Sequence, residues 1–181
     1  MLKIYSMIAA LLMVAMSPAY AQLSQFHEGP VFKGFGKIAS VDTDYKIPKG
    51  STFKVSFDVS KKGGVGKTNR TLDTAARFIN MHVAAGVPLN KINVAVVVHG
   101  GASQEMTKAA YYGAKHGGKE NFNKKAIAAL IEKGVKIIIC GQSAAYYGVK
   151  RDDLLPGVQM ALSAMTAHAL LQQDGYTINP F

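Results

Sequence analysis

The segment Val135–Asp153, VKIIICGQSAAYYGVKRDD, has the clearest strand–turn–helix pattern in the chain. Its first part, Val135–Ile139, is apolar apart from Lys136, and such a run predicts a short buried strand. The strand ends at Cys140, the one cysteine of the chain, and Gly141–Ser143 then turn into an Ala- and Tyr-rich helical segment. In a parallel sheet, this order places Cys140 at the carboxyl edge of a strand and at the start of a helix.

Cys140 is the predicted catalytic residue for two physical reasons. Open α/β sheets bind ligands at the carboxyl edge of their strands, and the partial positive charge of a helix start favours the thiolate form of cysteine. A single cysteine also excludes an intramolecular disulfide, so the thiol is buried, paired with another molecule or kept for its reactivity. The alternative is a small apolar core residue, a role that free cysteine often takes.

Strand and helix patterns alternate on both sides of this stretch. Further strands are predicted at Phe53–Val59, Ile92–Val98, Val158–Leu162 and Tyr176–Ile178. Helices are predicted between residues 70 and 83, around Gln104–Tyr112, over Phe122–Lys133, and from the cap Ser163 to Gln173. This alternation implies right-handed crossovers, and hence a single α/β domain with a mainly parallel sheet of about five strands and helices on both faces.

Residues 1–21 have the pattern of a signal peptide. Lys3 gives a basic start, Ile8–Met16 is apolar, and Ala19–Ala21 is a small-x-small cleavage site. The competing interpretation, an uncleaved membrane anchor, needs an apolar run of roughly 20 residues, which is longer than this one. We therefore expect a mature chain that begins near Gln22, is periplasmic or secreted, and has no membrane partner after cleavage.

Residues 22–51 predict an irregular N-terminal arm, because Gly, Pro, Lys and Asp occur there at close intervals. One short edge strand is expected around Gly36–Val41. The arm can pack on its own domain, which spans residues 52–181, or on a neighbouring subunit.

The formal net charge of +10 favours anionic partners. The lysines are scattered along the chain, however, and basic and aromatic residues show no regular alternation of the kind that marks a surface for single-stranded nucleic acid. No nucleic-acid partner is therefore expected.

His99 is the predicted partner of Cys140, because His99 and Gly100 follow the strand Ile92–Val98 at the same kind of strand end. An imidazole beside a thiol promotes thiolate formation and exchanges protons. The sequence places no Asp or Asn to orient the imidazole, so a hydrolytic triad is unsupported; the alternative is a histidine satisfied by the backbone of its turn. The predicted binding residues around Cys140 are His99, Gly100, Gly141, Gln142 and Ser143.

The other histidines carry weaker signals. His82 and His168 fall within predicted helices and are interpreted as packing residues. His27 and His116 fall in loops and are interpreted as solvated. A copper site of cysteine, histidine and methionine, with Met81 or Met160, lacks any paired ligand spacing. Neither a metal nor a cofactor is therefore expected.

Lys62–Thr68, KGGVGKT, resembles the phosphate-binding loop of ParA/MinD-type ATPases and lies between a strand and a helix. Lys61 replaces the outer glycine of the G-x-x-x-x-G-K-[ST] motif, and the later strands end without a magnesium-binding aspartate. An exported protein would also meet little nucleotide. The segment is interpreted as a flexible basic loop, with nucleotide binding through Lys67 and Thr68 as the alternative.

Three segments together resemble the DsrE/DsrF-like family, particularly its exported members: VAVVVHGGA, GVKIIICGQSAAYYGVKRDDLLPGV and ALSAMTAHALLQQDGY. The likeness covers Phe53–Phe181. It implies a compact α/β fold with a central parallel sheet, assembled as trimers or hexamers. In sulfur-relay members a cysteine after the hydrophobic strand receives sulfur as a persulfide, and Cys140 matches that position. Those members are cytoplasmic and deliver sulfur to tRNA or sulfur-oxidation enzymes, which an exported copy cannot do directly.

From this resemblance we expect an exported, homo-oligomeric protein that binds or carries sulfane sulfur on Cys140, as a sulfur carrier or sulfurtransferase. A small sulfur-containing anion is the expected small-molecule partner. The alternative is a non-catalytic oligomeric module that binds a small ligand or metal in the same cleft, with Cys140 incidental.

Overall fold

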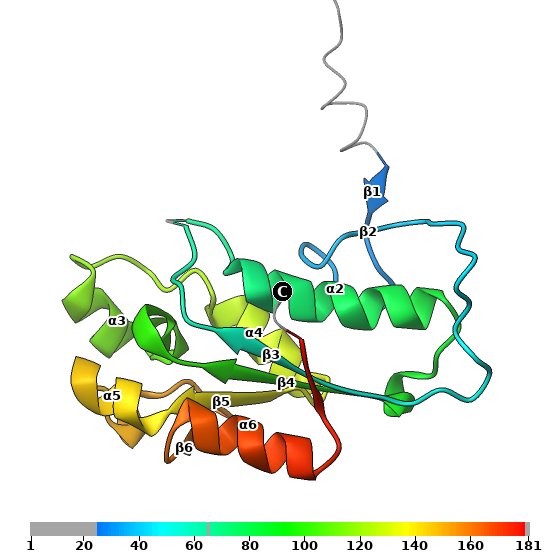
Figure 1. Ribbon diagram of the computed structural model, residues 1–181. Helices are drawn as coiled ribbons and strands as arrows, with labels where there is room; N and C mark the ends of the chain where they lie inside the picture. The colour runs from blue at the N-terminus through cyan, green and yellow to red at the C-terminus, as the bar shows by residue number, and fades with distance from the viewer. Residues whose placement is uncertain (1–24, 65, 180–181) are drawn as a thin grey trace, which may run out of the picture.

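Five parallel strands form the central sheet of the computed structural model, which describes residues 25–64 and 66–179 (Figure 1). The strand order is β6-β5-β4-β3-β7, and every neighbouring pair is parallel. The strands are β3 (Phe53–Val59), β4 (Ile92–Val98), β5 (Lys136–Cys140), β6 (Gln159–Ala161) and β7 (Thr177–Asn179). Each overlaps its predicted position, so the α/β fold with a mainly parallel sheet is confirmed.

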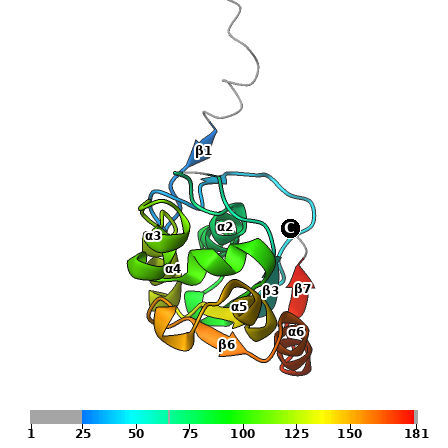
Figure 2. The ribbon, with the colours of Figure 1, turned by 90° about the vertical axis from the view of Figure 1, so that its left-hand side faces the viewer.

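Helices cover both faces of the sheet, as the sequence predicts (Figure 2). The helices α2 (Arg70–Ala84) and α4 (Lys124–Glu132) pack on one face, and α6 (Ala164–Gln173) packs on the other. Side chains of a strand alternate between the two faces. Large residues such as Phe57 therefore fill the core beneath α2 and α4, whereas smaller ones such as Val97 meet α6.

The segment between β4 and α4 departs from the sequence expectation, because the helix predicted around Gln104–Tyr112 is wrong. A 3-10 helix spans Gly100–Met106, and α3 (Ala109–Lys115) starts only after a break. The break lies at Thr107, whose extended backbone forms an isolated bridge with Leu154. A residue held in extended geometry cannot continue a helix, so two short helices replace one.

The remaining short elements complete the connections. The helix α5 (Gly141–Tyr147) follows β5, and two 3-10 helices span Leu89–Lys91 and Arg151–Asp153. The predicted cap of α6 is confirmed, since the Ser163 hydroxyl accepts a hydrogen bond from the Thr166 amide at 3.0 Å. In the part of the chain that the structure describes, no helix combines the length and the apolar character needed to cross a membrane.

The N-terminal arm forms a two-stranded ribbon of its own. Its strand β1 (Phe26–His27) pairs antiparallel with β2 (Ile38–Ala39). The short strand expected around Gly36–Val41 is therefore present, but its partner lies within the arm and it does not extend the edge of the central sheet. The arm runs over α2 in Figure 1. The expected signal peptide, residues 1–21, lies outside the described residues.

Asn80 of α2 fastens this arm to its own domain. Its side chain is fully buried, and Oδ1 accepts hydrogen bonds from the amides of Val31 and Phe32, both at 2.9 Å. Its Nδ2 donates to the carbonyls of Phe32 at 3.1 Å and Gly36 at 2.9 Å. The arm approaches so closely that a Cβ at Gly29 would lie 2.1 Å from the Asn80 side chain. The described arm therefore packs on its own domain through these hydrogen bonds.

We predict that Asn80→Ala lowers the free energy of unfolding by about 2–4 kcal/mol, because several buried backbone groups of the arm lose their partners. Urea unfolding followed by circular dichroism measures this change. Asn90→Ala is the matched control, since Asn90 is exposed and has no side-chain hydrogen bond among the described residues. The control should change stability by less than about 0.5 kcal/mol. Equal stabilities of the two variants would contradict the role given to Asn80.

Candidate functional site

Cys140 is the last residue of β5 and the N-cap of α5, as predicted. The residue is 6% exposed, and its sulfur accepts a hydrogen bond from the Ser143 amide at 3.5 Å. The turn that follows must be tight, because a Cβ at Gly141 would lie 2.6 Å from the carbonyl oxygen of Ala161. Only glycine lets the chain turn here against the end of β6.

Backbone amides from two helix starts converge on the Cys140 sulfur. Burial raises the pKa of this thiol, but hydrogen bonds from the amide and hydroxyl of Ser143 and from the amides of Ala164 and Gln142 act against it. Together these donors hold the pKa below its ordinary value. Because Ala164 opens α6 and Ser143 lies in the first turn of α5, the thiolate is stabilised from both sides.

The turn after β4 lies beside the turn after β5. Val98 pairs with Ile139, so the next residues, His99 and Cys140, lie level on neighbouring strands. By the alternation of side chains, both face the side of the sheet that carries α6. The Gly100 amide donates to the Ser143 hydroxyl at 3.0 Å and joins the two turns. The predicted grouping of these residues is thus present in the geometry.

Asp58 bridges two histidines next to this site. Its Oδ2 lies 2.9 Å from Nε2 of His99, and its Oδ1 lies 2.8 Å from Nε2 of His168. Burial raises the pKa of Asp58, but the hydrogen bonds from His168 and His99, with the charge of these rings, outweigh it and hold the pKa below its ordinary value. Asp58 is therefore ionised at neutral pH, and acid that protonates it weakens the bridge between β3, β4 and α6.

This cluster corrects two sequence expectations. A carboxylate does orient His99, and His168 is a polar partner of Asp58 rather than a packing residue alone. An ionised carboxylate only accepts hydrogen bonds, so both Nε2 atoms must carry their protons, which leaves Nδ1 of His99 as the acceptor of the neutral ring. One sequence signal was available: Asp58 is a polar residue next to the carboxyl end of a predicted strand.

Comparison with known proteins gives the same fold. A model of the DsrE/DsrF-like family matches residues 54–180. The chain belongs to the DsrE/DsrF-like family. This family is associated with sulfur relay. Among curated proteins, none matches this chain.

Two solved structures share the fold of this DsrE-like protein. One is MTH1491 of Methanobacterium thermoautotrophicum, described as a protein of unknown function, with a TM-score of 0.53 and 17% identity over 71% of this chain and 99% of that chain. The other is the ychN protein of E. coli, with a TM-score of 0.50 and 14% identity over 71% of this chain and 100% of that chain. At these identities the likeness shows the fold alone.

Some candidate residues of this DsrE-like protein lie differently from the expectation. The side-chain amide of Gln142 donates to the carbonyl of Leu162 at 3.2 Å, so it is the backbone amide of Gln142 that donates to the Cys140 sulfur. His82 stacks on Phe78 with ring centroids 4.0 Å apart, which confirms its packing role. His116 is not fully solvated, because its Nε2 is buried without a partner.

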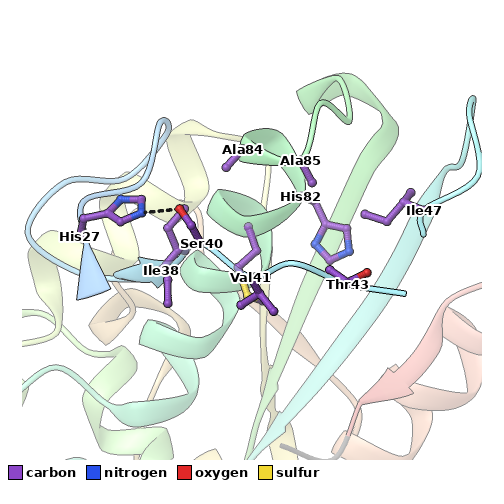
Figure 3. Close-up of a pocket in the computed structure, with 11 residues that line it drawn as sticks. His27, Ile38, Ser40, Val41, Thr43, Ile47, His82, Ala84 and Ala85 are labelled. Carbon is purple, nitrogen blue, oxygen red and sulfur yellow. Dashed lines mark hydrogen bonds between the residues drawn. The ribbon is translucent and has the colours of Figure 1, made fainter. Parts of the chain in front are cut away.

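No metal site accompanies the thiol in the described ranges, 25–64 and 66–179. There, no three His, Cys, Asp or Glu side chains gather closely enough to hold a metal ion. Met81, one methionine of the copper alternative, lines a different cavity of about 360 Å³ between the arm and the end of α2 (Figure 3). His27 lines the same cavity, 3.3 Å from the Ser40 hydroxyl, but Cys140 does not.

The glycine-rich loop is held by a buried carboxylate. Oε1 of Glu105 accepts from the Gly63 amide at 2.7 Å, and Oε2 accepts from the side-chain amide of Asn69 at 2.7 Å. Burial raises the pKa of Glu105, and these hydrogen bonds act against the rise. One loop amide that could face a phosphate is therefore already engaged within the protein.

We predict that Ser143→Ala moves the pKa of Cys140 upward, because the sulfur loses one of its hydrogen-bond donors. The rate of alkylation by iodoacetamide, followed against pH, should shift to higher pH and fall severalfold at pH 7. Gln142→Ala is the control, since it keeps the amide that faces the sulfur and should leave the profile unchanged. A profile for Ser143→Ala that overlays the parent profile would contradict this account of the thiol.

Proposed function

We propose that this DsrE-like protein is an exported sulfur carrier that accepts sulfane sulfur on Cys140 as a persulfide. The observation that carries the proposal is the thiol itself, which lies at the carboxyl edge of the sheet with a lowered pKa and with donors from two helix starts. These donors suit a thiolate and would suit the persulfide anion that replaces it. The family's association with sulfur relay supports the same chemistry.

The loading step is a displacement at sulfur. The Cys140 thiolate attacks the sulfane sulfur of a persulfide or of thiosulfate, and a new bond forms between Sγ and that sulfur. The sulfur–sulfur bond of the donor breaks, and its electron pair leaves with the donor's thiolate or with sulfite. Oxidation levels balance within the two reactants, so no further oxidant or reductant is required.

His99 is proposed to accept the proton of the Cys140 thiol on Nδ1 and to pass it to a thiolate leaving group. Its ring is oriented by Asp58 through Nε2, and Asp58 is in turn held by His168. Asp58 and His168 are therefore positioning residues for His99. A proton donor of this kind contributes about 10²-fold or more to a transfer step.

A non-catalytic binding module is the second candidate function. It is favoured by the low exposure of Cys140, since a thiol that is 6% exposed has little room for a large donor. In that case Cys140→Ala would keep the affinity for a small ligand or metal, and the native thiol would resist alkylation.

Export and self-association complete the proposal. The signal-peptide pattern of residues 1–21 supports a periplasmic or secreted chain, which a mature N-terminus at Gln22 would verify.

Large apolar side chains around β6 and α6 support a homo-oligomer, a trimer or hexamer by family resemblance. They are Tyr146 (83% exposed), Leu162 (72%), Met165 (80%) and Leu170 (59%).

We predict that the purified chain gains one sulfur mass after incubation with polysulfide or thiosulfate, and that reductant reverses the gain. Intact-protein mass spectrometry measures it, and Cys140→Ala should show none. With polysulfide as the donor, whose leaving group is a thiolate-type sulfur anion, His99→Gln should reach the same final loading at least about tenfold more slowly, with an altered pH profile. Full loading of Cys140→Ala would refute the role of the thiol, and an unchanged rate for His99→Gln would refute that of the imidazole.

We predict that Met165→Glu reduces the oligomer to smaller species, because it puts a charge into the exposed apolar surface of α6. Light scattering coupled to size-exclusion chromatography measures the mass. Met81→Glu is the control, since Met81 is 41% exposed on α2, away from that surface. A parent chain that runs as a monomer would remove the basis for self-association.

A further inference from the structure

A basic cavity of about 440 Å³ lies next to the Asp58 cluster, at the carboxyl end of β3. Residues of the glycine-rich loop, the end of β3 and the first turn of α2 line it. Its charged side chains are four cations and one carboxylate: Lys61, Lys62, Lys67, Arg70 and Asp58. This excess of positive charge in a concave site attracts anions.

Three of the four cations of this cavity have no carboxylate partner among the described residues, whereas Lys62 interacts electrostatically with the buried carboxylate of Glu105. Among residues 25–64 and 66–179, no carboxylate lies within 4.0 Å of the cationic groups of Lys61, Lys67 or Arg70. Lys62 donates to a neutral side-chain amide at 3.3 Å. The one carboxylate, that of Asp58, is engaged through both oxygens by two histidines. The cations therefore remain available to a ligand.

The start of α2 adds hydrogen-bond donors and a favourable dipole. The hydroxyl-bearing residues Thr68 and Thr71 line the cavity beside the first turn of this 15-residue helix. The dipole of such a helix favours an anion at its N-terminus. The acid of this turn, Asp73, is bonded to Arg77 at 2.7 Å and lies outside the cavity lining, so it does not cancel the effect.

The loop is arranged differently from the phosphate-binding loop of a nucleotide enzyme. The Gly63 amide donates to Glu105, and α2 begins at Arg70 rather than directly at the Lys67-Thr68 pair. The cavity therefore fits a compact tetrahedral anion better than a polyphosphate chain.

We propose that this cavity is a binding site for a small divalent oxyanion of the sulfate, thiosulfate or phosphate type. Lys61 and Arg70, which precede and follow the glycine-rich loop in the sequence, supply charge, and the threonine hydroxyls supply hydrogen bonds. The site rests on the cavity and its charges, so it does not depend on sulfur loading at Cys140.

Isothermal titration calorimetry of the purified chain tests the site, with sodium sulfate, thiosulfate and phosphate as probes and chloride at matched ionic strength as the blank. We expect saturable binding to one site per chain, weakened about tenfold or more in Lys61→Gln/Arg70→Gln. The charge-matched control is Lys49→Gln/Lys91→Gln, because these exposed lysines precede β3 and β4 at the opposite edge of the sheet. The control variant and Cys140→Ser should both bind as tightly as the parent.

Three results would overturn the proposal. The first is heat that does not saturate above the chloride blank, and the second is an equal loss of affinity in both double variants, which would mark a general charge effect. The third comes from titrations with AMP and ATP. Magnesium-dependent binding of ATP that exceeds phosphate binding more than about tenfold, and that is lost in Lys67→Ala, would assign the cavity to a nucleotide. Weak, magnesium-independent ATP binding supports the free anion as ligand.

Discussion

The common register of β3, β4 and β5 is the constraint on which the candidate site depends. Val59 pairs with Val98 and Val98 with Ile139, so the strands reach the same edge of the sheet together. His99 and Cys140 then leave the sheet side by side. A slip of one residue would turn either side chain into the apolar core beneath α2 and α4.

Two carboxylates near this edge show how surroundings set charge. Glu105 is buried and Asp58 is half-buried, and Asp58 meets two histidines, whereas Glu105 meets mainly amides. Histidine hydrogen bonds and charge lower the pKa of Asp58, while burial prevails at Glu105 and raises its pKa. The same edge therefore holds one carboxylate that orients His99 and one buried carboxylate that fixes the glycine-rich loop.

The thiol and the basic cavity belong to different parts of the same edge. Cys140 is surrounded by neutral donors from two helix starts, which favour a thiolate without placing a cation against it. The cations gather instead around the end of β3 and the start of α2. Asp58 lies between them, since it both lines the cavity and bonds to the histidine beside the thiol.

Periodicity and capping are local, and the sequence alone predicted what depends on them. The strand positions, the place of Cys140 at a helix start, and the Ser163 cap all follow from residues that are close in the chain. The helix around Gln104–Tyr112 failed because a bridge to Leu154 interrupts it, and that bridge is a distant contact.

The contacts between polar groups depend on the packing of segments that are far apart in the sequence. Asp58 and His168 are 110 residues apart, and their contact depends on how α6 packs over β4 and β5. The same packing brings the Ala164 amide to the Cys140 sulfur. Asn80 binds the arm through hydrogen bonds to backbone groups, and the sequence of the arm gives no sign of these bonds. Strands and caps are determined by residues that are close in the sequence, whereas these contacts form when the packing of helices on the sheet brings distant segments together.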